Sequence, residues 1–89
     1  MRAIVTVIGK DRVGIIAGVC SLLADAGVNI LDISQTILQE YLTMIMLVDT
    51  SASTAPFDEL AQALKTRGEE QALSIRIQRE DIFQAMHRI

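Results

Sequence analysis

The chain has 89 residues, which is enough for one domain and too few for two. It carries 8 Lys and Arg against 11 Asp and Glu, a formal net charge of −3, with basic residues interspersed among acidic ones. This pattern excludes the clustered basic surface with which proteins hold nucleic acid or an anionic membrane. No segment reaches the roughly 18 apolar residues that cross a bilayer, so we expect a soluble, cytoplasmic protein.

Residues 2–8 are expected to form the first strand, because apolar side chains occupy both faces of a period-two alternation. That pattern is typical of a central strand covered on both sides. After a turn at residues 9–12, the apolar period changes to that of a helix over residues 13–26. Asp11 is placed to cap this helix at its start, and Gly27 is placed to end it.

Residues 28–39 and 41–48 are predicted to be two further strands, joined by a tight hairpin near Gln39 and Glu40. In the first of these strands, polar residues alternate with isoleucines. In the second, both faces are apolar, so we expect it to lie inside the sheet.

A second helix is expected after the polar loop at residues 49–53, with Ser53 or Thr54 as its cap and Pro56 in its first turn. Gly68 is placed to close it.

Residues 73–78 alternate between apolar and polar side chains, which predicts a half-buried strand. Residues 81–89 carry an amphipathic stripe that is typical of a short helix; the stripe consists of Ile82, Phe83, Met86 and Ile89.

The element order is therefore β-α-β-β-α-β with a tail, which predicts an α+β, ferredoxin-like fold: a four-stranded antiparallel sheet with two helices on one face, plus a short C-terminal helix. We expect one domain over residues 1–89, with a core at 1–79 and a helical tail at 80–89. Hydrophobic residues make up 51% of the chain, and the two helices can cover only one face of the sheet. A second copy is the simplest cover for the other face, so we expect a homodimer or higher homo-oligomer.

Several kinds of chemistry are poorly supported. RNA-binding domains of this shape stack bases on exposed sheet aromatics, whereas the aromatics here are Tyr41 and two phenylalanines on predicted helix stripes. Cys20 is the only cysteine, which excludes an internal disulfide and a CxxC metal site. We expect no cofactor and no metal.

Enzyme chemistry is no better supported. His87 is the only histidine and lies near the end of the chain, where we expect a surface role. Cys20 lies on the apolar side of the first helix, which favours a buried, inert thiol. Asp11 and Asp32 could be imagined as paired carboxylates, but capping or solvated roles are favoured. We therefore expect no catalysis.

One region favours ligand binding. Residues 11–17 lead from the first strand into the first helix, whose free N–H groups and positive dipole end favour an anion such as an amino-acid carboxylate. Gly14 would let a ligand or a partner backbone approach the first turn. Asn29, at the start of the next strand, could supply both donors and an acceptor. The alternatives are that Asp11 simply caps the helix and that Asn29 is a turn residue.

The run Asp11-Arg12-Val13-Gly14-Ile15-Ile16-Ala17, followed by Leu22-Leu23-Ala24-Asp25-Ala26-Gly27-Val28-Asn29-Ile30, resembles the signature of ACT domains. The resemblance extends over the whole chain except the tail. Residues 29–37 and 82–86 resemble a narrower group, the small stand-alone bacterial and archaeal ACT proteins akin to regulators of glycine cleavage.

The resemblance implies that an amino acid binds where two domains meet. The first loop and helix start of one chain would face the early second strand of its partner. By that analogy, Asp11, Gly14 and Asn29 are the ligand-binding residues. The chain differs from many members of the family at three positions: Val13 stands where proline is common, Gly9 where some amino-acid-binding members have a histidine, and Asp11 where some have an asparagine.

Two functions follow from this reading. The first is a non-catalytic sensor that binds an amino acid at a dimer interface and signals to a separate protein. The second is an interaction protein that oligomerises through its sheet face and binds no ligand.

Overall fold

The computed structural model describes residues 1–10 and 14–82 of the chain. Within them, the elements follow the order β-α-β-β-α-β, as the sequence predicts. Their bounds are β1 (Arg2–Lys10), α1 (Ile15–Asp25), β2 (Asn29–Leu38), β3 (Tyr41–Asp49), α2 (Phe57–Glu70) and β4 (Ser74–Arg79).

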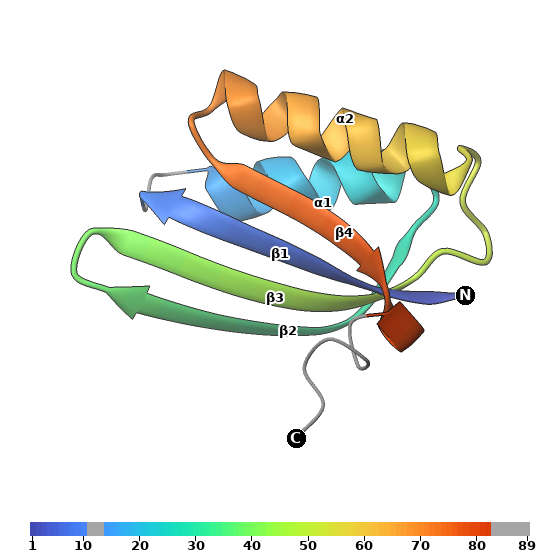
Figure 1. Cartoon of the computed structure of the whole chain (residues 1–89), viewed down its shortest axis with the longest axis horizontal. Coiled ribbons are helices and arrows are strands. Elements are labelled where there is room, and N and C mark those ends of the chain that lie inside the picture. The colour runs from blue at the N-terminus through green and yellow to red at the C-terminus, as the bar shows by residue number, and fades with distance from the viewer. Residues whose placement is uncertain (11–13, 83–89) are drawn as a thin grey trace.

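The four strands form one sheet in the order β2-β3-β1-β4, and every neighbouring pair is antiparallel. Both helices lie on the same face of this sheet, side by side, as Figure 1 shows. The strands with two apolar faces, β1 and β3, take the two central places, as expected from their sequences. The sequence-based prediction of an antiparallel ferredoxin-like sandwich is confirmed.

The core lies between the helices and the inner face of the sheet. Alternate residues of β1 and β3 point into it, because side chains in a strand alternate between faces. Among the described residues, no polar or charged side chain is buried there. The core members are Ala3, Val5, Val7, Ile15, Val19, Leu23, Val28, Leu42, Met44, Met46, Val48, Leu60, Leu64, Leu73, Ile75 and Ile77.

Two surfaces of the sheet stay open. The face away from the helices exposes Ile8 by 49% and Ile45 by 41%, so the expected cover of β1 on both sides is not supplied by the residues that the structure describes. The edge strand β2 is exposed along nearly its whole length, including Ile33 and Ile37, because the helices do not extend over it. Both surfaces are therefore open to contact with another molecule.

The ends of α1 differ from the sequence-based prediction. The helix begins at Ile15 rather than at residue 13, and Gly14 is its N-cap, which has no side chain to donate or accept a capping bond. Gly27 follows the helix with φ +79°, the left-handed conformation that glycine adopts without strain. The predicted end of the helix is therefore confirmed.

The ends of α2 also differ from the sequence-based prediction. Pro56 is the N-cap, and the predicted caps serve the preceding loop instead: the hydroxyl of Ser53 accepts a hydrogen bond from the N–H of Ala55 over 3.2 Å. Thr54 donates its backbone N–H to the carbonyl of Ala26, which ties this loop to the end of α1. The helix runs through Gly68 to Glu70, so Gly68 does not end it.

Gly68 serves close packing within the last turn of α2. A Cβ at this position would lie 2.7 Å from the carbonyl oxygen of Leu73. After β4, a helical turn begins at Glu80 (Figure 1). The rest of the predicted tail helix, residues 83–89, lies outside the described residues.

Candidate functional site

Gly14 stands at the N-terminal end of α1 with φ +88°. This left-handed conformation by itself favours glycine, with or without a ligand. A Cβ built at Gly14 would meet no described atom within 4 Å. Gly14 therefore lies beside open space at the positive end of a helix, rather than in the first helical turn as the sequence suggested.

A guanidinium group lies beside the same end of α1. The Nη2 atom of Arg67, from the last turn of α2, is 3.5 Å from the position that a Cβ of Gly18 would occupy. The buried Nε of Arg67 and the buried Oε1 of Gln71 have no hydrogen-bond partner among the described residues. Arg67 also stands in the last turn of α2, so its charge lies between the negative end of that helix and the positive end of α1.

Sequence reasoning missed Arg67 as a site residue. Its position near the end of α2 indicates only a cation that suits the helix dipole. Its place beside Gly18 depends on how the two helices pack, which no local pattern specifies.

Gly9, where some members of the resembled family carry histidine, has a packing role. A Cβ at Gly9 would collide with Cδ2 of Leu73, whose side chain fills the space beside the strand. The absence of a side chain at position 9 therefore lets the start of β4 pack closely on β1.

Asn29 is the first residue of β2, is exposed, and pairs with Asp49 at one end of the sheet. Gly14 follows the opposite end, where Lys10 pairs with Tyr41. The strand between these ends has nine residues, a span of roughly 27 Å at about 3.3 Å per residue. One chain therefore does not bring Gly14 and Asn29 together.

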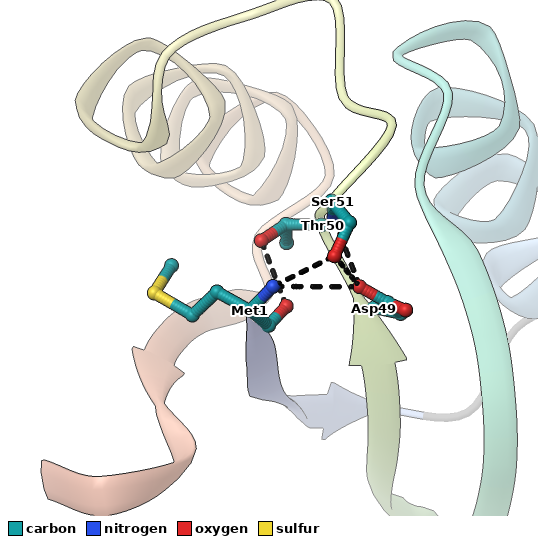
Figure 2. A network of polar contacts seen from close by, with 4 residues as sticks. All are labelled: Met1, Asp49, Thr50 and Ser51. Atoms are coloured by element: carbon teal, nitrogen blue, oxygen red, sulfur yellow. Dashed lines mark hydrogen bonds and ion pairs between the residues drawn. The ribbon is translucent and has the colours of Figure 1, made fainter.

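The end of the sheet that carries Asn29 holds a network of polar contacts, drawn in Figure 2. The N-terminal ammonium of Met1 donates to Oγ of Ser51 over 2.8 Å and lies 3.6 Å from Oδ1 of Asp49. The hydroxyl and the backbone N–H of Thr50 both donate to the carbonyl of Met1. These contacts join the start of β1 to the end of β3.

Asp49 is the acceptor at the centre of this network. The hydroxyl of Ser51 donates to its Oδ1 over 2.6 Å, and the backbone N–H of Ser51 donates to the same atom over 2.9 Å. These two bonds, followed by the nearby ammonium of Met1, hold the pKa of Asp49 below its ordinary value.

The remaining residues singled out from the sequence do not assemble into a catalytic group. Asp11 and His87 lie outside the described residues. Cys20 is a half-buried free thiol, and the exposed Asp32 accepts a hydrogen bond from the N–H of Ile33. The described part of the chain contains no group of three or more His, Cys, Asp or Glu that could hold a metal ion. None of its helices is long and apolar enough to span a membrane.

A groove of about 580 Å³ runs along the other edge of the sheet, between α2 and β4. Its lining includes Ala61, Lys65 and Glu69 of α2 and residues 73–78. Neither Gly14 nor Asn29 contributes to it, so the predicted site and this groove are separate places.

Comparison with known proteins agrees with the fold. The family model of the ACT domain matches residues 2–78. A UPF0237 protein of Clostridium acetobutylicum is 58% identical over 89 residues, which cover 100% of both chains. A solved ACT domain protein from Streptococcus pneumoniae is 45% identical, with a TM-score of 0.81 and 98% of each chain covered.

A further solved structure, described as a candidate transcriptional repressor of the glycine cleavage system, is 26% identical with a TM-score of 0.73. The match covers 86% of this chain and 44% of that one. The narrower resemblance seen in the sequence is confirmed by these relatives. The sheet order, the helix layer and the match over residues 2–78 together show that the chain belongs to the ACT domain family.

Proposed function

We propose that the protein is a non-catalytic regulatory sensor that binds an amino acid between two copies of the chain. One observation carries this proposal: Gly14 and Asn29 lie at opposite ends of the sheet. They can contact one small ligand only if they come from different chains. A dimer that places these ends side by side forms two such sites, related by symmetry.

The chemistry at the Gly14 end suits a carboxylate. The start of α1 offers free N–H groups and the positive end of a helix, and Arg67 adds a guanidinium beside it. Asn29 of the second chain then supplies an amide that can donate and accept hydrogen bonds to the rest of the ligand. Asp11 is the proposed partner for the ligand's amino group, because a carboxylate would repel the ligand's own carboxylate.

The regulated protein is proposed to be a separate chain. The match covers 100% of the Clostridium relative but only 44% of the candidate repressor, in which the matched region is joined to further chain. A ligand that binds one arrangement of the dimer better than another would change the surface offered to that protein.

A thermal-shift screen of the twenty amino acids, followed by calorimetric titration, tests the sensor. A ligand at about a hundred times its dissociation constant stabilises by about 2.7 kcal/mol, which is a clear rise in Tm. Asn29→Ala and Arg67→Gln should each weaken binding, by about 1–3 kcal/mol for each buried partner removed.

Lys65→Gln is the matched control, because Lys65 lies on the same helix as Arg67 and is exposed. The sensor proposal fails if no amino acid stabilises the protein. The site assignment fails if Asn29→Ala and Arg67→Gln bind as tightly as Lys65→Gln does.

The exposed isoleucines on the open face of the sheet favour a second candidate, an interaction protein that binds no ligand. Ile8 and Ile45 lie on that face. Under this alternative, the amino-acid screen is flat and Ile45→Lys dissociates the oligomer.

A further inference from the structure

Strand β4 forms one edge of the described sheet, and α2 runs beside it (Figure 1). An edge strand leaves the backbone N–H and C=O groups of its outer side without a partner strand. The groove between α2 and β4 follows this edge and includes all of residues 73–78. The six residues of β4 span about 20 Å at about 3.3 Å per residue, which is an ordinary strand length. The groove can therefore take one extended segment of another chain.

The two faces of β4 differ in character. Ile75 and Ile77 point toward the helices and are buried. Arg76 lies between them and pairs with Thr6, so its exposed side chain is on the open face of the sheet. On the helix side, the exposed Lys65 of α2 lines the groove. A strand added beside β4 would thus meet Arg76 on one face and Lys65 on the other.

Both cations are open to a partner. Among the described residues, neither Lys65 nor Arg76 forms an ion pair or a side-chain hydrogen bond. Arg79, by contrast, is paired with Asp81. The lining contains one carboxylate, Glu69, at the end of the groove where α2 leads into β4. The groove therefore carries two unpaired positive charges, although the net charge of the whole chain is −3.

The two cations lie at the same level along the groove. The turn at residues 71–73 reverses the chain between α2 and β4, so both distances can be counted from it. Lys65 lies six residues before residue 71, or about 9 Å at about 1.5 Å per helical residue. Arg76 lies three residues after residue 73, or about 10 Å along the strand. Because neighbouring strand residues point to opposite faces, two adjacent acidic residues would place one carboxylate beside each cation.

A second copy of the chain does not supply such a segment. None of the four described strands contains two adjacent acidic residues, and Asp32 is the only charge on the other edge strand, β2. A second β4 would bring its own Arg76 and Arg79 beside these cations, and like charges oppose pairing. The charge of β4 therefore disfavours self-pairing and favours an acidic strand of a different protein.

We propose that the groove between α2 and β4 binds an extended, acidic segment of a separate protein, which pairs with β4 as a further strand of the sheet. Backbone hydrogen bonds to β4 supply the affinity. Lys65 and Arg76 select a segment with two adjacent carboxylates. Neither Gly14 nor Asn29 lines the groove, so this proposal does not require that an amino acid binds.

Fluorescence anisotropy with a labelled peptide of sequence VTVEETVT, blocked at both ends, tests the selection in the absence of amino acids. The native protein should bind this peptide about tenfold more tightly than VTVQQTVT, because the latter loses two charge pairs. Added salt should narrow the difference, since it screens exposed charges. Equal binding of the two peptides, or binding of neither, would overturn the proposal.

A charge swap provides an independent readout. The double variant Lys65→Glu, Arg76→Glu should bind VTVKKTVT and lose its affinity for VTVEETVT. Both side chains are exposed, so the double variant should fold, which an unchanged Tm verifies. Lys10→Gln is the matched control, because Lys10 is an exposed cation of β1 outside the groove. A folded double variant that still prefers VTVEETVT contradicts the proposal.

Hydrogen exchange locates the bound peptide. VTVEETVT should protect outward N–H groups of residues 74–79 and leave those of β2 unchanged. Protection of β2 instead would place the peptide at the other edge, and a smaller oligomer of the double variant in sedimentation would show that a second copy covers β4; either result overturns the proposal. Protection of β4 together with a flat amino-acid screen would support this proposal and reject the sensor.

Discussion

The two ends of the sheet contrast in how completely their polar groups are paired. At the end where β1 begins, Met1, Asp49, Thr50 and Ser51 bond to one another. At the end where β1 finishes, a guanidinium nitrogen of Arg67 and an amide oxygen of Gln71 are buried without a partner among the described residues. Burying a polar group without a partner costs stability, and among the described residues that cost falls at the second end alone.

The same contrast holds for the glycines. Gly27, near the paired end, and Gly14, at the other end, both have positive φ. A Cβ at Gly27 would lie 2.7 Å from the carbonyl oxygen of Ala52, whereas one at Gly14 would lie in open space. Among the described residues, Gly27 is therefore closely packed, whereas Gly14 has room for a side chain.

The largest effect is expected for Gly27→Ala. The left-handed conformation costs an L-residue about 1–2 kcal/mol, and the contact with Ala52 adds an overpacking cost of about 1–3 kcal/mol. We expect a loss of about 3 kcal/mol in the free energy of unfolding, measured by urea denaturation. A loss below 1 kcal/mol would show that the loop at Ala52 moves away freely.

Gly14→Ala should cost less, because only the backbone strain of about 1–2 kcal/mol applies. Measured in the same way, it should remain clearly more stable than Gly27→Ala. Equal losses for the two variants would show that Gly14 is closely packed, and would remove the open space from the proposed site.

Ala72→Gly should stabilise the protein. Ala72 has φ +57° just after α2, where the left-handed strain of alanine exceeds the entropic cost of glycine by about 0.5–1 kcal/mol. The matched control is Ala63→Gly in the middle of α2, which should lose about 1 kcal/mol. A lower free energy of unfolding in both variants would mean that Ala72 is not strained in the folded protein.

The smallest effect concerns acid stability. Because the folded pKa of Asp49 is lower than the unfolded one, this carboxylate contributes stability above its unfolded pKa. The contribution is lost as the pH falls through the folded pKa. Asp49→Asn should therefore flatten the acid limb of a plot of unfolding free energy against pH. An unchanged limb would show that the Ser51 bonds are not retained in solution.

Much of the fold could be predicted from local patterns. The two-sided apolar alternation of β1 and β3 predicted their central places, and Gly27 predicted the end of α1. The helix starts were less predictable, because Gly14 and Pro56 act as caps that offer no side-chain bond. The prediction that Gly68 ends α2 was wrong, because the role of this glycine is close packing against Leu73, which depends on the tertiary structure.

The candidate site was less predictable than the fold. Gly14 and Asn29 stand out through backbone freedom and hydrogen-bonding capacity, which are local properties. Their separation to opposite ends of the sheet follows from strand order, and the position of Arg67 follows from helix packing. Neither strand order nor helix packing can be read from a short stretch of sequence.

The contact between Gly9 and Leu73 has a consequence for how such a chain can diverge. A larger residue at position 9 collides with Leu73, and a smaller residue at position 73 alone leaves a cavity beside β1. The colliding atom is a terminal methyl group of Leu73, so a larger residue at position 9 requires the end of that side chain to move, while the pair of changes together restores the volume. A histidine at position 9 is therefore expected to be accommodated best with a smaller residue at position 73, so the two positions should covary among relatives.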